Sequence, residues 1–268
     1  MEINKSNVFE LMNITGTKPS KDFGQNFLIE PTICQKIADV LVTTEEDNIC
    51  EIGPGLGSLT NFIDLKNGKL TCIDIDPKMI QILNELYKDS DITFINNDIR
   101  KVNLGNFTKI IGNLPYNITT ELIVHLLTNA KECKQYVFMI QAEAINRFID
   151  IKGKEYGPAS VLVHMLGNIK RQFTVKAGSF YPAPKCNSVV FEINVENRHS
   201  REEAIEVYQL AKKLFLNRRK TILNNLSNIV GKEKASGVLK TLNISETTRP
   251  EEIDPEQFLE ISNLLKKS

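Results

Sequence analysis

The residues best suited to chemistry in this sequence are Asn113, Leu114 and Tyr116, which surround Pro115. Pro115 fixes one backbone torsion and keeps Leu114 out of the helical region, so carbonyl groups at this turn lack helical partners. An amide side chain, free carbonyls and an aromatic face in one short turn can hold a planar base by its exocyclic amine. The alternative is an ordinary turn with a buried tyrosine.

The segments on either side of this turn have opposite periodicities. Residues 109–111 form an apolar run, and residues 119–130 carry leucine and isoleucine at helical spacing. The pattern predicts a short buried strand, the turn and then a helix.

A glycine-rich turn follows a second apolar strand at residues 48–52. Gly53, Gly55 and Gly57 alternate, which allows a tight turn to bring backbone amides against a ligand at a helix N-terminus. A dinucleotide fingerprint has its third glycine where this chain has Ser58. The spacing therefore favours an adenosine cofactor without a pyrophosphate over a nicotinamide cofactor.

Carboxylate and amide side chains stand at the ends of the predicted strands. Asp74 lies about twenty residues after the first glycine, where dinucleotide folds place a ribose-binding carboxylate. Asp98 follows the next strand, while Glu51 and Asn113 end two others. Helix capping is the usual role of such an aspartate. Because open parallel sheets bind ligands at these ends, we expect one crevice that contains all four side chains.

The order of the elements indicates the fold class. Strand and helix patterns alternate to about residue 148, which predicts a doubly wound Rossmann-like α/β sheet. Residues 169–175 and 188–195 add two extended runs, and only helical patterns follow residue 197. We expect two domains, at residues 1–197 and 198–268, the second smaller and all-helical. Residues 1–19 are polar, and we expect a mobile arm there.

The predicted helical domain contains a basic cluster. Lys212, Lys213, Arg218, Arg219 and Lys220 occur between residues 207 and 230 without an acidic residue. A solvated face is the common explanation, but local clustering in a neutral protein also suits phosphate binding.

Composition narrows the function classes. The 268 residues carry no formal net charge, so charge alone does not indicate nucleic-acid binding. The five cysteines are far apart, and neither they nor the three histidines have a metal-binding spacing. No apolar run is long enough to span a bilayer, and no signal-peptide core is present. We expect a cytoplasmic protein without a metal site.

Six motifs together resemble one enzyme family. They are residues 23–28 (Phe-Gly-Gln-Asn-Phe-Leu), 51–57, 113–117, 156–161, 180–188 and 218–221, all in the family's order. The chain is similar to the ribosomal RNA adenine dimethyltransferases that act on the small subunit, of the kasugamycin-resistance type. The resemblance implies a class I methyltransferase fold. It departs at Asp74, where the family usually has glutamate, and at Cys186-Asn187, where it usually has Val-Asp.

The resemblance also implies a cofactor, S-adenosylmethionine, and a set of contacts to it. These are Asn26 and Leu28 from the amino-terminal turn, Gly53 at the methionine part, Asp74 at the ribose, Asp98 at the adenine amine, and Asn113 between cofactor and substrate. The implied reaction methylates the exocyclic amines of two adjacent adenines in the 3′-terminal hairpin loop of 16S ribosomal RNA. The implied partner is a 30S particle or its precursor, bound by a monomeric enzyme.

These roles agree with the chemistry of the residues. An adenine amine is a poor nucleophile, and acceptors at Asn113 and the Leu114 carbonyl stabilise the charge that develops on it. Tyr116, with Phe180 opposite, is expected to stack on an adenine that has left its loop. Arg218, Arg219 and Lys220 are expected to contact phosphates.

Two other functions remain open at this stage. The large-subunit adenine methyltransferases of the macrolide-resistance type share the core motifs, although Leu114 and the basic helix favour the small-subunit enzymes. A ribosome-assembly factor with this fold but no turnover is the other, because fold alone does not imply activity.

Overall fold

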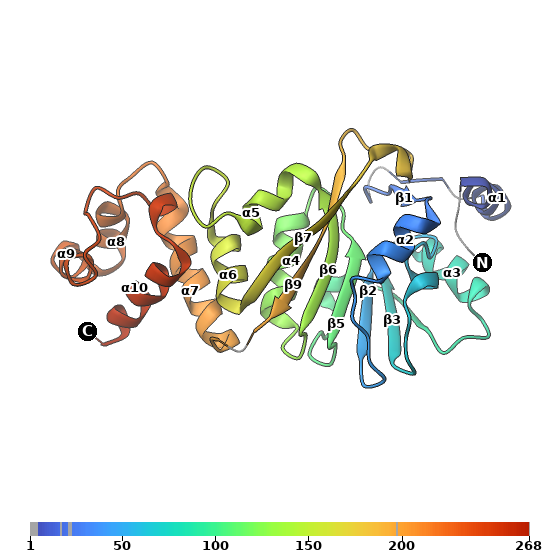
Figure 1. Ribbon diagram of the computed structural model, residues 1–268, viewed down its shortest axis with the longest axis horizontal. Coiled ribbons are helices and arrows are strands. Elements are labelled where there is room, and N and C mark those ends of the chain that lie inside the picture. The colour runs from blue at the N-terminus through green and yellow to red at the C-terminus, as the bar shows by residue number, and fades with distance from the viewer. Residues whose placement is uncertain (1–4, 17, 21–22, 197, 268) are drawn as a thin grey trace. The chain divides into compact units, whose positions relative to one another are not determined.

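A mixed seven-stranded sheet is the central feature of the computed structural model, which describes residues 5–16, 18–20, 23–196 and 198–267 (Figure 1). The strands are β1 (Phe27–Leu28), β2 (Asn48–Ile52), β3 (Lys69–Asp74), β4 (Thr93–Asn96), β5 (Lys109–Asn113), β6 (Gln135–Gln141), β7 (Gly167–Val175), β8 (Phe180–Tyr181) and β9 (Ser188–Val195). β1 and β8 form a separate two-stranded sheet.

Helices occupy most of the remaining chain. The α-helices are α1 (Lys5–Thr15), α2 (Pro31–Ala38), α3 (Pro77–Leu86), α4 (Thr119–Asn129), α5 (Asn146–Ile149), α6 (Pro158–Leu166), α7 (Arg201–Leu214), α8 (Ile222–Val230), α9 (Lys232–Thr241) and α10 (Pro255–Lys267). Short 3-10 turns are η1 (Thr60–Phe62), η2 (Ile99–Lys101), η3 (Ala142–Ile145), η4 (Ala177–Ser179), η5 (Phe215–Asn217) and η6 (Pro250–Glu252).

The strand order in the large sheet is β4-β3-β2-β5-β6-β9-β7. The pairs from β4 to β6 are parallel, whereas β9 runs antiparallel to β6. The order reverses between β2 and β5, which is the switch point where open α/β sheets bind ligands. The predicted doubly wound α/β fold is confirmed.

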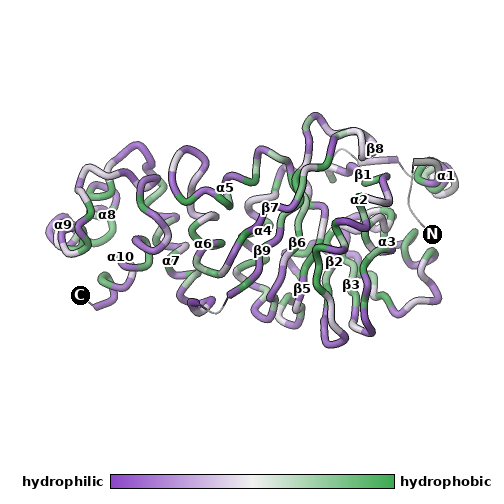
Figure 2. The backbone as a smooth tube through the Cα atoms, viewed as in Figure 1, coloured by the Kyte–Doolittle hydropathy of each residue, from purple (hydrophilic) through white to green (hydrophobic). Residues whose placement is uncertain are grey.

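The central strands are hydrophobic because both faces of the sheet are covered (Figure 2). All but the last residue of β6 are buried, and so are four of the five residues of β2. These continuous apolar runs are what the sequence pattern predicted.

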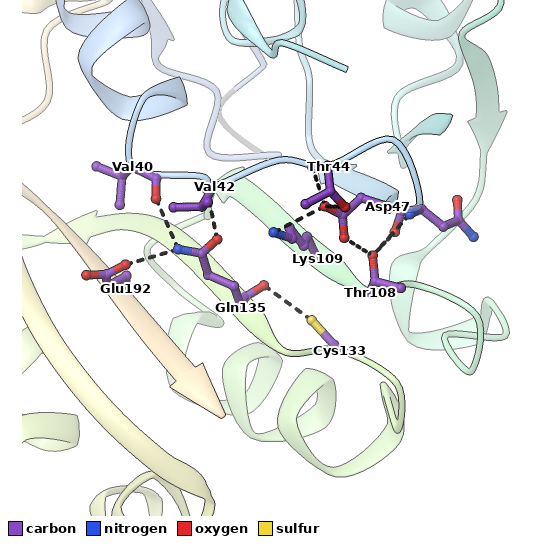
Figure 3. A network of polar contacts seen from close by, with 10 residues as sticks. Val40, Val42, Thr44, Asp47, Thr108, Lys109, Cys133, Gln135 and Glu192 are labelled. Atoms are coloured by element: carbon purple, nitrogen blue, oxygen red, sulfur yellow. Dashed lines mark hydrogen bonds and ion pairs between the residues drawn. The ribbon is translucent and has the colours of Figure 1, made fainter. Parts of the chain in front are cut away.

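A polar network joins the amino-terminal ends of three strands (Figure 3). Lys109, at the start of β5, forms an ion pair with Asp47 at 3.2 Å, and the two side chains are only 11% and 8% exposed. Thr108 donates to the other oxygen of Asp47 at 2.7 Å. Gln135, at the start of β6, donates to Glu192 at 3.0 Å. The network lies at the opposite edge of the sheet from the carboxyl ends of these strands.

The amino-terminal segment is a helix, so the predicted mobile arm is wrong for residues 5–15. Val8, Leu11 and Met12 have the i, i+3, i+4 spacing of one helix face and are buried. They pack in one cluster with Leu56 and Met79, among others. Burial of this apolar face offsets the weak helix preference of the polar residues. Residues 1–4 lie outside the described part of the chain.

The glycine-rich turn is not followed by an α-helix, which corrects a second expectation. Only η1 follows it, and the left-handed residues Lys66 and Asn67, at φ 48° and 74°, then turn the chain into β3. The eight residues between Gly57 and Lys66 contain only the single 3-10 turn of η1.

Contacts within the chain define two compact units: Met1–Glu143 with Lys170–Asn194, and Ala144–Ile169 with Val195–Ser268. In the second unit α6 packs against α7, and α8 against α9. The units group residues 144–169 with the helical segment, whereas the sequence assigned them to residues 1–197. The division into domains at residues 1–197 and 198–268 therefore stays a prediction.

Candidate active site

A pocket opens along the carboxyl edge of the sheet, beside the switch point. Its lining residues are 23–28, 51–55, 58–59, 73–75, 97–100, 113–116, 118 and 122, and its empty volume including the mouth is about 1060 Å³. All six residues assigned to the cofactor line this pocket, namely Asn26, Leu28, Gly53, Asp74, Asp98 and Asn113.

The glycine turn lines the pocket through Gly53, Pro54 and Gly55, and two glycines of this turn have close neighbours. Gly55 has φ +56°, and a Cβ there would come within 3.0 Å of the Phe27 ring. Gly57 has φ +87°, and a Cβ there would be 3.0 Å from Leu83. A side chain at either position would be strained and crowded, so glycine is required to bring the backbone to this place.

Asp74, the last residue of β3, is an almost fully buried acceptor. Its two oxygens accept from the backbone N–H of Gly55 at 3.2 Å and of Asp76 at 2.9 Å. Burial raises the pKa of Asp74 to about 6, although these two hydrogen bonds oppose the shift. The carboxylate therefore lies at the pocket with its orientation fixed by two turns.

Glu51, in β2, is a pocket residue to which the sequence assigned no cofactor contact. Its side chain is 1% exposed and accepts from Thr60 at 2.6 Å and from Cys72 at 3.5 Å. Burial raises its pKa to about 7, and the charge of Asp74 adds to the shift. The sequence feature that could have indicated this residue is a single acidic side chain in an apolar strand, two positions before Gly53.

Asp98 is held by the guanidinium of Arg100. Arg100 Nε and Nη2 donate to its two oxygens at 3.0 and 2.6 Å, and the Arg100 backbone N–H adds a bond at 3.0 Å. These hydrogen bonds lower the pKa of Asp98. Asp98 thus stays a charged acceptor in the lining of the pocket and also caps η2.

The central turn joins β5 to α4, as the sequence predicted. The Leu114 N–H donates to the Met139 carbonyl at 3.0 Å, which positions the turn against β6. The Tyr116 hydroxyl lies 2.8 Å from the Ser188 hydroxyl, so the ring is fixed from a second strand. Burial raises the pKa of Tyr116. Asn113, Leu114 and Tyr116 therefore line one side of the pocket together.

The amino-terminal turn, defined here as residues 23–28, forms another wall. The Asn113 side chain donates to the Asn26 carbonyl at 3.2 Å, and Ser58 donates to the Leu28 carbonyl at 2.8 Å. β1 within this turn pairs with β8. The turn thus contacts the central turn and the glycine turn across the sequence.

The assignment of Phe180 as a ring opposite Tyr116 is wrong in this structure. Phe180 is 2% exposed and belongs to a core cluster with Leu28 and Cys34. It pairs with Leu28 in the small sheet, and that pairing turns the ring into the core. The exposed aromatic ring on the pocket is instead Phe23, which is 40% exposed.

The basic cluster divides into residues with different surroundings. Arg218 bonds to the Gly153 carbonyl, pairs with Glu251 at 3.5 Å and lies 5.9 Å from the centre of the Phe215 ring. These contacts give Arg218 a structural role within the helical unit, and its predicted contact with phosphate stays a prediction. Arg219 and Lys220 are exposed. They remain candidates for contact with a nucleic acid.

The polar groups that line the pocket include the Glu51, Asp74 and Asp98 carboxyl groups and the Asn113 amide oxygen, and the Arg100 guanidinium that pairs with Asp98 also lines it. Such a set fits a ligand with hydroxyl and amine donors and a positive charge. No cluster of metal-ligating side chains occurs within the described residues. In the same part of the chain, no helix has the length and hydrophobicity needed to cross a membrane.

Comparison with known proteins gives a consistent result over almost the whole chain. The family model described as "Ribosomal RNA adenine dimethylase" matches residues 16–267. A curated protein of Mesoplasma florum, "Ribosomal RNA small subunit methyltransferase A", is 34% identical over 258 residues, which cover 91% of this chain and 97% of that protein.

Solved structures show the same fold. A dimethyladenosine transferase from Plasmodium falciparum has a TM-score of 0.76 and 25% identity, and the match covers 90% of this chain and 98% of that one. The 23S rRNA methyltransferase ErmE has a TM-score of 0.70 at 21% identity, with 90% and 100% coverage, and shows likeness of fold alone.

Proposed function

Because the chain belongs to the ribosomal RNA adenine dimethylase family, we propose that it transfers methyl groups from S-adenosylmethionine to the exocyclic amines of two adjacent adenines in the 3′-terminal hairpin loop of small-subunit ribosomal RNA. The observation that supports this most directly is the convergence of Asp74, Asp98 and Asn113 with Tyr116 on one pocket. The proposed partner is a 30S particle or its precursor, and the proposed active form is a monomer.

The cofactor fits the acceptor groups of the pocket. S-adenosylmethionine would supply a methyl group bonded to a positively charged sulfur. The adenine nitrogen would attack the carbon of this methyl group, and the sulfur would leave as a neutral thioether. Asp74 would accept from the ribose hydroxyls and Asp98 from the adenine amine. Gly53 has a φ of +63° and no side chain, so the methionine part would lie against its backbone. Glu51 adds a buried carboxyl group to the same site.

The substrate side of the site is the central turn. Asn113 Nδ2 is engaged by the Asn26 carbonyl, so its Oδ1 can accept from the target amine. The Leu114 carbonyl accepts no hydrogen bond within the part of the chain that the structure describes. Two acceptors at the amine stabilise the positive charge that develops as the nitrogen attacks. The proton then leaves to water, and no side chain is required as a base.

Tyr116 supplies the stacking surface. Its ring is held through Ser188, so little side-chain entropy is lost when a base stacks on it. A base that has left its loop gains on the order of 1–3 kcal/mol from such a stack. In place of Phe180, the exposed ring available at the pocket is Phe23.

The test is transfer of label from S-adenosylmethionine to ribosomal particles. Unmethylated 30S particles, 50S particles and free 16S RNA would be incubated separately with the protein, and the labelled nucleosides identified. Dimethyladenosine in the 30S sample supports the proposal. Label only in 50S particles would assign the macrolide-resistance reaction, and binding to 30S without label would assign a non-catalytic assembly role.

A further inference from the structure

The side chain of Gln25 connects the amino-terminal turn to α3. Gln25 Nε2 donates to Asp76 Oδ2 at 2.8 Å, although the two residues are 51 positions apart. Gln25 Oε1 accepts from the Ser20 N–H at 2.8 Å, and the Gln25 N–H donates to the Ser20 carbonyl at 3.1 Å. Gln25 also lines the pocket. Both ends of its amide are therefore used, one for each segment.

Asp76 connects Gln25 to Asp74, the residue proposed to bind the ribose. It is 6% exposed, and its Oδ1 accepts from the Lys78 N–H at 3.0 Å as the cap of α3. Its own N–H donates to Asp74 at 2.9 Å. A continuous chain of hydrogen bonds thus runs from Ser20 through Gln25 and Asp76 to Asp74.

The bond from Gln25 is the one that can break without loss of the α3 cap. No lysine or arginine within the described residues forms an ion pair with Asp76, so neutral donors alone compensate its buried charge. A hydrogen bond from an amide to a carboxylate is about twice as strong as one between neutral groups. Gln25 therefore adds a charged-acceptor hydrogen bond to the contacts that hold the amino-terminal turn, which include the pairing of β1 with β8, while the α3 cap is kept by the Lys78 N–H.

We propose that Gln25 is a positioning residue that closes the amino-terminal turn over the pocket and couples that closure to cofactor binding at Asp74. The inference rests on the proposed function for the identity of the cofactor. The Asn26 carbonyl of the same turn accepts from the Asn113 side chain at 3.2 Å, so a turn held by Gln25 also supports the central turn. A cofactor that binds through Asp74 favours the closed turn, and the closed turn holds the cofactor.

The decisive experiment reverses the donor and acceptor. Gln25→Glu places a second carboxylate against Asp76, and Asp76→Asn places an amide donor against the Gln25 donor. In the double variant, Glu at position 25 accepts from the Asn amide at position 76, and the Asn oxygen still caps α3. Each single variant should weaken binding of S-adenosylhomocysteine, measured by calorimetry, about tenfold, which corresponds to the loss of one hydrogen bond to a charged group. The double variant should return to within about threefold of wild type.

Gln35 provides a matched control. Its Nε2 donates to Asp39 at 2.8 Å on the exposed face of α2, and neither residue lines the pocket. Gln35→Glu makes the same chemical change and should leave the affinity unaltered. Thermal unfolding of every variant separates loss of folding from loss of closure.

A second measurement follows the turn without any ligand. Gln25→Glu should speed amide hydrogen exchange at Gln25 and Ile29, and the double variant should restore it. In turnover assays the KM for S-adenosylmethionine should rise with the dissociation constant while the KM for the RNA particle stays unchanged. Wild-type affinity in folded Gln25→Glu, or a double variant as weak as the singles, would overturn the proposal. Absence of methylation by the wild-type protein would contradict the proposed function instead, and the exchange measurement would still test the coupling of Gln25 to Asp76.

Discussion

Asn113 Nδ2 donates a hydrogen bond to the backbone carbonyl of Asn26, 3.2 Å away and 87 residues earlier in the sequence. The bond determines which end of the Asn113 amide faces the pocket. With the NH2 group engaged, the oxygen is presented as an acceptor, which is the polarity that a target amine requires.

Replacement of Asn113 by aspartate is the first test of this arrangement. Asn113→Asp should lower single-turnover methylation by about a hundredfold or more, because a carboxylate is repelled by the Asn26 carbonyl and leaves its position. Asn48→Asp is the control, since Asn48 makes a similar amide-to-carbonyl bond to Asn106 at 3.0 Å, away from the pocket. Equal losses in both variants would attribute the effect to stability.

Tyr116 should act through its ring more than through its hydroxyl. Tyr116→Phe and Ser188→Ala each remove the 2.8 Å contact between the two hydroxyls and should lower kcat/KM only about threefold. Tyr116→Ala also removes the stacking surface and should lose on the order of 1–3 kcal/mol of transition-state stabilisation. Steady-state kinetics with 30S particles, beside cofactor titrations, measures the difference. Equal losses of cofactor affinity and turnover in Tyr116→Ala would mean that Tyr116 is a core residue and does not stack on the substrate base.

Asp74 should contribute to cofactor affinity through its charge. Asp74→Asn keeps the shape of the side chain but only one acceptor oxygen, so one of the two backbone N–H groups of Gly55 and Asp76 loses its partner, and thermal unfolding of the variant is the control for folding. Binding of S-adenosylmethionine should weaken by about 1.5–3 kcal/mol, the range for hydrogen bonds to charged groups. Calorimetric titration provides the value. Unchanged affinity in a folded variant would place the ribose contact at another residue.

The buried Glu51 should make the ligand-free protein less stable as the pH rises. Burial raises its folded pKa from 4.5 to about 7, so the folded state binds the proton more tightly than the unfolded state. Stability from this group is complete below about pH 4.5 and is lost as the pH rises through 7, by up to about 3 kcal/mol. Glu51→Gln stays neutral and should unfold at a higher temperature than wild type at pH 8, with little difference at pH 4.5. Parallel pH profiles for the two proteins would contradict the burial of an ionisable group here.

Salt dependence should separate the residues of the basic cluster. If Arg219 and Lys220 each neutralise a phosphate, the double variant to glutamine should flatten the slope of log affinity against log salt by about 1.4–1.8. Lys232→Gln with Lys240→Gln, on α9, removes the same charge and should leave the slope nearly unchanged. Arg218→Gln should instead lower stability, because Gly153 and Glu251 lose their partner. If the Arg219 and Lys220 double variant keeps the wild-type slope of log affinity against log salt, these two residues belong to a solvated face and do not bind phosphates.

Local patterns in the sequence were sufficient for most of the site. The strand at residues 48–52 is followed by Gly53, the strands at 69–74 and 109–113 end in Asp74 and Asn113, and a parallel sheet brings all such ends to one edge. The proline turn and the alternating glycines restrict the backbone through their own chemistry, so their positions could be predicted without knowledge of the fold. For these residues the order of elements along the chain was enough.

The tertiary structure decided the residues whose roles depend on distant partners. Phe180 has the composition of a stacking residue, but pairing of β8 with β1 turns its ring into the core. Arg218 belongs to a basic run, yet the carbonyl of Gly153 and the carboxylate of Glu251 bind it. Residues 5–15 look like a polar arm until Val8 and Leu11 find apolar partners on Leu56 and Met79. In each case the free energy comes from contacts between segments far apart in the chain, and a periodic pattern carries no information about which segments meet.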